Sequence, residues 1–600
     1  MSSEEATPLR SASRVAPEDR VAIGISFGNS NSSIAYTFDD RVEVIANEDG
    51  DRQIPTVLSY VDGEEYYGQQ AKNFLVRNPK NTVAYFKDLL GRDFASIDPT
   101  YCHASAHPQE TNGEVTFTII DKAGEPVGDD SDETKPADPS TVSVHEIATR
   151  YLRRLVGSAS DYLGRKVTSA VISVPSNFSD AQRQAIIKAA DAADLEILQL
   201  ISDPAAIAAA YTARIDAEAN SSDAAAAAAN QKKDKVVLVL DLGGTRSDAA
   251  VLSSSAGMVT VLAAVHDYEF VGAALDKVLI DHFAKEFAKK NKGVDPRENA
   301  RSLAKLRLEA EATKKALSLG NNASFSVESL ADGIDFTSTI NRVRYETLAR
   351  PVFEGINRLA AEVVKKAGLD PLDVDVVVLS GGSAHTPRIA VNMAMLFGEH
   401  ASVVAPSTVP SATNPSELQA RGAALQANLV RDFDAEEIEQ SAHSAVSTVQ
   451  HTSLAVGVIA TPLEVGAEGE TEVFTPIIVA ESAVPVRRAI LVAGPKEGGD
   501  VLLKFAEAST HVHTIAPPKK EAKAKGDEAE DEDDSDFDSE DEDEEERKKG
   551  WKVQGLLAEA ALRGVKAGAK IEVAISIRAD MAVSFTAREV GGKAAIRGSF

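Results

Sequence analysis

The fold is decided by the stretch Val236-Val-Leu-Val-Leu-Asp-Leu-Gly-Gly-Thr-Arg-Ser-Asp248. An apolar, β-branched run ends in Asp241, and two glycines follow almost at once. Such a run is typical of a buried strand, and Gly243 and Gly244 allow a sharp turn with backbone N–H groups close to a phosphate. The stretch therefore predicts a nucleotide site at a strand end, where the Asp241 carboxylate is suited to hold a metal-bound water.

A second copy of this pattern lies near the N-terminus, in Val21-Ala-Ile-Gly-Ile-Ser-Phe-Gly-Asn-Ser30. The strand and the glycine turn are the same, but Ser26 stands where the first stretch has an aspartate. One turn has kept its carboxylate and the other has not. The pair predicts a nucleotide site that binds without turning over.

Composition excludes several classes of protein. The 600 residues carry a net charge of −29, from 92 acids and 63 bases. The block from Asp527 to Glu546 holds 16 of the acids and no base, so the rest has 76 acids against 63 bases, or −13. This mildly acidic remainder does not favour nucleic-acid binding. With Cys102 as the only cysteine, no apolar leader and no membrane-length apolar run, we expect a soluble, cytoplasmic protein.

The chain is expected to fall into distinct parts. Residues 1–19 are predicted to be a disordered leader, and 20–430 an α/β domain with glycine turns after its strands. A polar linker is expected at 431–450. Residues 451–600 are predicted to form a small antiparallel β-domain, in which about 517–549 make a disordered acidic insertion.

Several longer strings narrow the assignment, and they occur in a fixed order along the chain. They are Tyr67-Gly-Gln-Gln-Ala-Lys72, Asn78-Pro-Lys-Asn-Thr-Val83, Leu89-Leu-Gly-Arg92, Val174-Pro-Ser-Asn-Phe-Ser-Asp-Ala-Gln-Arg183, Asp203-Pro-Ala-Ala-Ile-Ala-Ala-Ala-Tyr211, Gly381-Gly-Ser383 and Asn414-Pro-Ser-Glu417. Together they resemble the heat-shock protein 70 family over about Val21 to Val430, with a weaker match beyond. The resemblance implies a two-lobed, actin-like ATPase domain of the α/β class, followed here by a small antiparallel β-sandwich domain without a helical lid.

The resemblance also implies which residues bind ATP. By position these are Gly28, Asn29, Ser30, Lys72, Asp241, Gly243, Gly244, Thr245, Arg246, Glu311, Lys314, Lys315, Gly381, Gly382 and Ser383. Lys72, Asp203 and Asp241 match residues of the catalytic and metal shell, and we expect them to be vestigial. Asp241 is the one expected contact to Mg²⁺, through water. Taken alone, Asp203 is equally well read as a cap for the helix beginning at Pro204.

Departures from the family pattern point to lost hydrolysis. Ser26 replaces a metal-site aspartate, and Asn29 replaces a phosphate-contacting threonine. Arg246 falls where the family has a threonine beside the γ-phosphate, where it is expected to hold that phosphate as a static cation. His385 replaces an arginine near adenine. Because phosphoryl transfer depends on positioning and charge around Mg²⁺, the loss of a carboxylate is expected to cost orders of magnitude in rate.

The expected linker is polar where the family has leucines, and no lid sequence follows the β-domain. Within the family these traits resemble an atypical, lidless branch that pairs stably with the J-domain protein zuotin in the ribosome-associated complex. The resemblance implies an ATP-binding, hydrolysis-deficient co-chaperone that reaches the ribosome through zuotin, assists nascent chains and acts with an ordinary heat-shock protein 70. Two alternatives are a conventional ATP-hydrolysing foldase and a nucleotide-exchange factor of the divergent branch.

Overall fold

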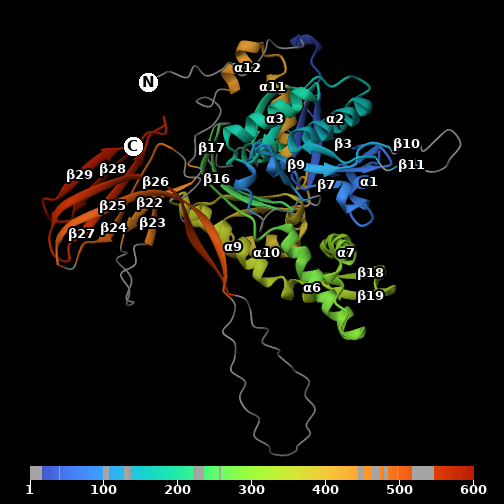
Figure 1. The fold of residues 1–600 in the computed structure, drawn as a ribbon. Coiled ribbons are helices and arrows are strands. Elements are labelled where there is room, and N and C mark those ends of the chain that lie inside the picture. The colour runs from blue at the N-terminus through green and yellow to red at the C-terminus, as the bar shows by residue number, and fades with distance from the viewer. Residues whose placement is uncertain are drawn as a thin grey trace, which may run out of the picture. The chain divides into compact units, whose positions relative to one another are not determined.

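The computed structural model describes residues 16–39, 41–98, 107–123, 125–126, 134–135, 137–219, 235–255, 258–369, 371–442, 452, 454–460, 473–478, 484–495, 497–515 and 546–600 (Figure 1). The chain divides into two compact units, 1–449 and 450–600, and each is described by itself. Residues 1–15 of the expected leader at 1–19, and residues 517–545 of the expected acidic insertion at about 517–549, lie outside the described residues. Residues 17–19 form a 3-10 turn, and residues 546–549 belong to the strand β26 (Glu546–Val565).

The first unit has two lobes, each built on one mixed sheet. In the first lobe the strand order is β14-β13-β1-β2-β3, with β1 parallel to β13 and antiparallel to β2. The helices α2 (Val144–Leu163) and α3 (Asp180–Ala192) belong to this lobe, and their apolar faces share its core. The strands are β1 (Ala22–Phe27), β2 (Asn31–Phe38), β3 (Arg41–Ile45), β13 (Ser169–Val174) and β14 (Glu196–Ser202), and β4 (Ile54–Pro55) pairs with β2.

The sheet of the second lobe repeats this topology. Its order is β17-β16-β15-β20-β21, with β15 parallel to β20 and antiparallel to β16. Ser26 and Asp241 therefore hold equivalent positions, paired with Ser173 and Ser380 of the neighbouring parallel strands. The strands are β15 (Lys235–Leu242), β16 (Ser247–Ser255), β17 (Met258–Asp267), β20 (Val376–Ser380) and β21 (Ser402–Val404).

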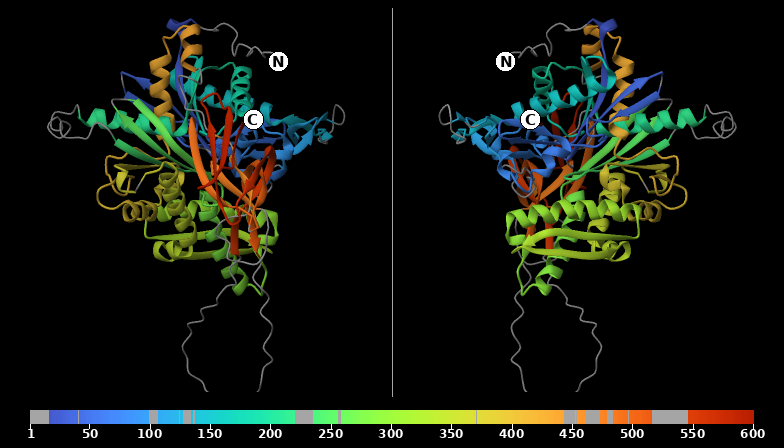
Figure 2. Two further views of the ribbon diagram at one scale, coloured as in Figure 1. Left: turned by 90° about the vertical axis from the view of Figure 1, so that its left-hand side faces the viewer. Right: turned by 90° about the vertical axis from the view of Figure 1, so that its right-hand side faces the viewer.

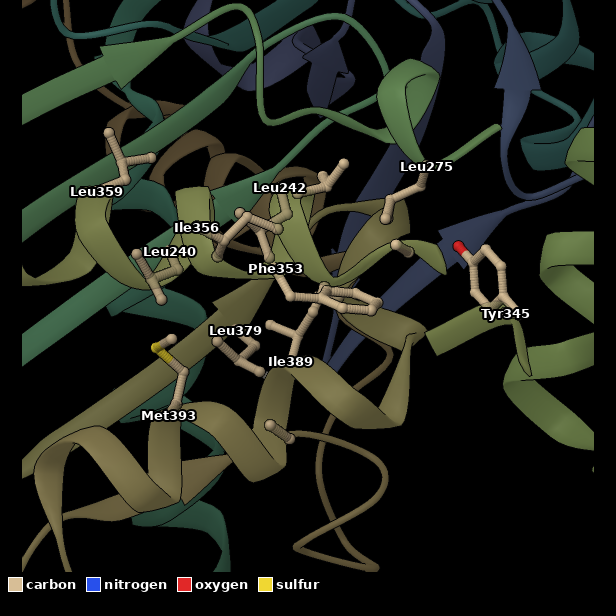
Figure 3. Packing of buried hydrophobic residues seen from close by; sticks show 14 of the residues in the cluster. Leu240, Leu242, Leu275, Tyr345, Phe353, Ile356, Leu359, Leu379, Ile389 and Met393 are labelled. Atoms are coloured by element: carbon tan, nitrogen blue, oxygen red, sulfur yellow. The ribbon is translucent and has the colours of Figure 1, made fainter. Parts of the chain in front are cut away.

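A large apolar core fixes the end of β15. Leu240 and Leu242 of that strand point toward Phe353 and Ile356, with Leu379 of β20 beside them (Figure 3). Leu242 is fully buried, so the glycine turn that begins one residue later starts from a closely packed position. The helices and hairpin of this lobe are α6 (Gly272–Lys290), α7 (Ala300–Leu319), α8 (Arg342–Leu348), α9 (Arg350–Lys366), α10 (Pro387–Phe397), β18 (Asn322–Ala331) and β19 (Ile334–Asn341).

Helices α4 (Asp203–Ala219) and α11 (Leu418–Val430) pack tightly against each other and against the sheets. A side chain at Gly422 would overlap the backbone of Ala206 in α4, and one at Gly24 of β1 would overlap the backbone of Ala424. Only glycine permits such close approach at these two points. The contact holds the first turn of α11 beside the ends of β1 and β15.

The first half of the expected linker is part of the first unit. Arg20 Nη1 donates hydrogen bonds to the backbone oxygens of Arg431 and Phe433, and the helix α12 (Ala435–Ala442) follows. Ile438 of this helix is buried in a small cluster with residues of β13, β14 and α11. The polar composition of 431–450 gave no sign of these few contacts. The described part of the first unit therefore extends through the expected linker as far as Ala442.

Short elements complete the first unit (Figure 2). They are α1 (Gly68–Asn73), β5 (Val57–Val61), β6 (Glu64–Tyr67), β7 (Thr82–Ala84), β8 (Gln109–Thr111), β9 (Glu114–Ile119), β10 (Glu125–Pro126), β11 (Thr134–Lys135) and β12 (Ser140–Ser143), with single 3-10 turns such as Pro17–Asp19. Across the described ranges, no helix is both long and apolar enough to cross a membrane.

The second unit consists of two antiparallel four-stranded sheets around one apolar core. The small antiparallel β-domain expected from the sequence is confirmed. Between 454 and 600 the described residues contain no helix. The sheets are β23 (Val473–Ile478), β22 (Ala455–Ala460), β25 (Gly499–Ile515) and β26 (Glu546–Val565), and β24 (Val486–Ala493), β27 (Lys570–Ile577), β28 (Val583–Glu589) and β29 (Ala595–Ser599).

Candidate nucleotide site

The two glycine turns face each other across the lobes. Asn29 Nδ2, in the turn after β1, donates a 3.0 Å hydrogen bond to Thr245 Oγ1 in the turn after β15. Ser30 Oγ is buried without a hydrogen-bond partner among the described residues, and a Cβ added at Gly244 would overlap it. An orphaned hydroxyl beside a bare backbone turn fits the oxygens of a polyphosphate.

A third turn meets the second one. Gly381 has φ of 84°, which favours glycine, and it leads into the turn Gly382–His385. Ser383 Oγ lies 3.3 Å from the backbone oxygen of Gly243, so the third turn touches the second. A Cβ added at Gly382 would meet no atom within 4 Å, which leaves open space at the turn expected to hold adenosine. His385 Nε2 lies 3.1 Å from Asn414 Oδ1.

Basic residues from both lobes converge beside these turns. Lys72 Nζ of α1 lies 2.6 Å from Glu311 Oε2 of α7, so this ion pair joins the first lobe to the second. Lys315 Nζ lies 2.8 Å from the other oxygen of Glu311, and Lys314 Nζ lies 2.7 Å from Asp276 Oδ1. Burial alone would raise the pKa of Glu311, but Lys72 and Lys315 outweigh it and lower that pKa to about 2.

Replacing Glu311 by glutamine is expected to lower the free energy of unfolding at pH 7 by about 1–3 kcal/mol, because Lys72 loses a partly buried partner. A depressed pKa stabilises the folded state above the unfolded value of 4.5, and this contribution is lost as the pH falls toward about 2. The gap between wild type and Glu311→Gln should therefore be constant from pH 7 to about 4.5 and shrink below it. Urea denaturation followed across this range measures the gap.

Glu309→Gln is the matched control for this measurement. Glu309 lies in the same helix and accepts one hydrogen bond from the backbone N–H of Ser326, which a glutamine oxygen also accepts. We expect a change below about 0.5 kcal/mol that does not depend on pH. An equal loss of stability in both variants would contradict the role given to the pair of Lys72 and Glu311.

The equivalent positions Ser26 and Asp241 are connected by a residue that the sequence analysis did not single out. Gln419, in the first turn of α11, donates from Nε2 to Asp241 Oδ2 at 2.6 Å. Its Oε1 accepts a hydrogen bond from Ser26 Oγ at 2.6 Å. Burial, with Asp203 and Asp248 nearby, raises the pKa of Asp241 to about 7. Gln419 stands two residues after the string Asn414-Pro-Ser-Glu417, which was the only signal for it.

Arg246 is held by residues around the second turn. Its Nε donates to Asp248 Oδ2 at 2.7 Å, and its Nη2 also pairs with Asp248 Oδ1. Nη2 further donates to Asn177 Oδ1 of the first lobe at 2.7 Å, and the guanidinium lies over the Tyr268 ring. From the sequence, Arg246 was expected to hold the γ-phosphate. In the structure, its guanidinium forms an ion pair with the Asp248 carboxylate. Asn177 and Tyr268 were not predicted as parts of the site.

The remaining acidic residue of the expected metal shell is Asp203. It is the first residue of α4 and is buried, and burial raises its pKa to about 6. Within the described ranges, no group of three or more His, Cys, Asp or Glu side chains is arranged to hold a metal ion. Ser26 offers a neutral hydroxyl, and Asp241 is already bonded to an amide. The residues thus fit a polyphosphate but do not fit a Mg²⁺ ion held by carboxylates.

A family model described as Hsp70 protein matches residues 22–487. The chain is 40% identical over 588 residues to a heat shock protein 70 homolog of Schizosaccharomyces pombe, covering 97% of this chain and 96% of that one. It is 38% identical over 579 residues to the ribosome-associated complex subunit SSZ1 of Saccharomyces cerevisiae, covering 96% and 99%. Heat shock 70 kDa protein 2 of Paracoccidioides lutzii is 34% identical over 469 residues, which are 78% of this chain and 64% of that protein.

Proposed function

The chain belongs to the Hsp70 family, and we propose that it is an ATP-binding, hydrolysis-deficient co-chaperone that forms a stable complex with a J-domain protein at the ribosome. ATP would be held by the three glycine turns, with Lys72, Glu311, Lys314 and Lys315 beside them. Bound ATP would supply a charged polyphosphate. The chain's own contribution is to position that polyphosphate with backbone N–H groups and fixed cations.

The observation that carries the proposal is Ser26. It holds the position in β1 that Asp241 holds in β15, and it offers a hydroxyl where its counterpart offers a carboxylate. Phosphoryl transfer needs concentrated positive charge at the phosphates. Metal ions supply this charge, and carboxylates hold the metal ions in place. A backbone cradle that binds through N–H groups does not need that charge to retain its ligand. Binding is therefore expected to survive a substitution that abolishes turnover.

The partner is proposed from similarity over nearly the whole chain to a subunit of the ribosome-associated complex. We propose the J-domain protein zuotin as that partner, with a cytoplasmic location at the ribosome and an ordinary heat-shock protein 70 as the chaperone that the pair supports. The second unit offers a place for an extended segment of zuotin. Its outer strand β26 carries exposed apolar side chains at Trp551, Val553 and Leu556, which suit strand addition.

Single-turnover hydrolysis tests the first part of the proposal. Purified protein is mixed with radiolabelled ATP, and the bound nucleotide is identified by chromatography after denaturation. We expect intact ATP and a rate at least about 100-fold below that of a conventional heat-shock protein 70 measured in parallel. A rate equal to the conventional chaperone would favour the alternative of an ATP-driven foldase, which the retained Lys72, Asp203 and Asp241 would then serve.

Reconstitution with zuotin tests the partner. We expect the two proteins to elute as one complex with one copy of each from size-exclusion chromatography, whether or not ATP is added, because a static nucleotide site gives ATP no control over the β-domain. The complex, but neither protein alone, should stimulate an ordinary heat-shock protein 70. Separate elution of the two proteins at micromolar concentration would contradict the assignment.

A further inference from the structure

Gln419 lies between the ends of β1 and β15 and contacts both strands. Its amide donates to Asp241 and accepts from Ser26, each at 2.6 Å. An ordinary metal site would place at Asp241 a water that donates a hydrogen bond to the carboxylate. The side-chain N–H of Gln419 makes that same donation without a cation.

The neighbouring charges agree with a site that works without a metal. Arg246 neutralises Asp248, and Lys87 Nζ lies 3.6 Å from Asp88 Oδ1 while its side chain stays buried. With Ser26 uncharged, Asp241 and Asp203 are the remaining acids of the expected metal shell. Asp203 is buried, and Asp241 accepts a hydrogen bond from Gln419. Because Ser26 is neutral and Arg246 pairs with Asp248, a polyphosphate at this site would face less negative charge than at a site where all of these positions carry free carboxylates.

We propose that Gln419 replaces the metal-held water of this site, so that the protein binds a nucleoside triphosphate as a metal-free anion about as well as with Mg²⁺. This inference rests on the proposed ATP binding and adds the chemical form of the ligand. It makes Gln419 a positioning residue that holds Asp241 in place and fills the position a metal shell would use.

Isothermal titration of the full-length wild-type protein with ATP, in MgCl2 and in EDTA, tests the proposal directly. We expect the two dissociation constants to agree within about threefold. Binding in MgCl2 with a loss of more than about tenfold in EDTA would overturn this inference and leave the proposed ATP binding intact. No binding in either buffer would overturn both. This comparison does not depend on the folding of any variant.

The variant Gln419→Glu sharpens the test. It is nearly isosteric but puts a carboxylate against Asp241, which repels the phosphates and creates a pair of oxygen ligands for Mg²⁺. We expect ATP affinity in EDTA to fall by at least about tenfold and MgCl2 to restore it, so that the variant acquires a Mg²⁺ dependence that the wild type lacks. Thermal melting without nucleotide checks that the variant is folded.

Gln426→Glu is the matched control. Gln426 lies two turns further along the same helix and donates to Gln199 Oε1 at 2.7 Å, away from both strand ends. It should bind ATP like the wild type in both buffers. A Mg²⁺ dependence that appears equally in Gln426→Glu, or one that fails to appear in a folded Gln419→Glu, would overturn the role assigned to Gln419.

Discussion

Replacing Gly422 by valine is expected to cost the first unit more than about 4 kcal/mol, or to prevent its folding. The added Cβ would overlap the carbonyl of Ala206 in α4. Because the overlapped atoms belong to the backbone, no side-chain rotation can relieve the clash. Helices α4 and α11 would have to separate, which would also withdraw Gln419 from Asp241. Because all described helices lie in the first unit, the helical circular dichroism of the full chain in urea reports this unit.

Gly157→Ala is the control for that experiment. Gly157 lies inside helix α2, and an added Cβ would meet no atom within 4 Å. Alanine there is expected to stabilise the same unit by about 0.5–1 kcal/mol, since it removes only the conformational freedom of glycine. If Gly422→Val were as stable as the wild type, the close packing of α11 on α4 would be contradicted.

Replacing Gly244 by valine is expected to weaken ATP binding by about 100-fold or more. The new side chain would overlap Ser30 and force the two phosphate turns apart, so that they could no longer contact one polyphosphate together. Isothermal titration with ATP measures the loss, and melting without nucleotide separates it from unfolding.

Gly382→Leu tests the expected adenosine turn by filling its open space, without forcing neighbouring segments apart. The space around Gly382 is open, so the variant should melt like the wild type while its ATP affinity falls by about tenfold or more. Gly320→Ala serves as the control, because its Cβ would make ordinary contacts of 3.6 Å at the end of α7. Unchanged ATP binding in Gly382→Leu would contradict the assignment of adenosine to this turn.

Much of this architecture was predictable from local sequence. A β-branched run that ends in a glycine turn identifies a buried strand and its ligand edge, as Val236 to Gly244 does. The duplicated pattern around Ser26 predicted a second strand that ends in a glycine turn, and the structure places Ser26 at the position in β1 that Asp241 holds in β15. The antiparallel β-domain of the second unit was likewise predictable from the sequence.

What the sequence did not predict depends on contacts between distant segments. Gln419 is 178 residues from Asp241 and 393 from Ser26, and no local pattern marks a glutamine that bridges two strands. The direction of Arg246 is likewise set by Asn177 and Asp248, which compete with any ligand for its guanidinium. The packing of Ile438 was hidden because a single buried residue anchors an otherwise polar helix. Such choices are made by tertiary packing and not by propensity.

In the part of the chain that the structure describes, side-chain bridges join the lobes of the first unit, among them Lys72 with Glu311, Asn29 with Thr245, and Asn177 with Arg246. Gln419 adds an indirect bridge between Ser26 and Asp241. In a switch, a ligand moves an equilibrium only by the difference in its affinity for an open and a closed state. A protein that already closes on its own side chains leaves little of that difference for ATP to supply. If ATP binds as proposed, we therefore expect it to stabilise the first unit without switching it between two states, so that the unit acts as a constitutive scaffold.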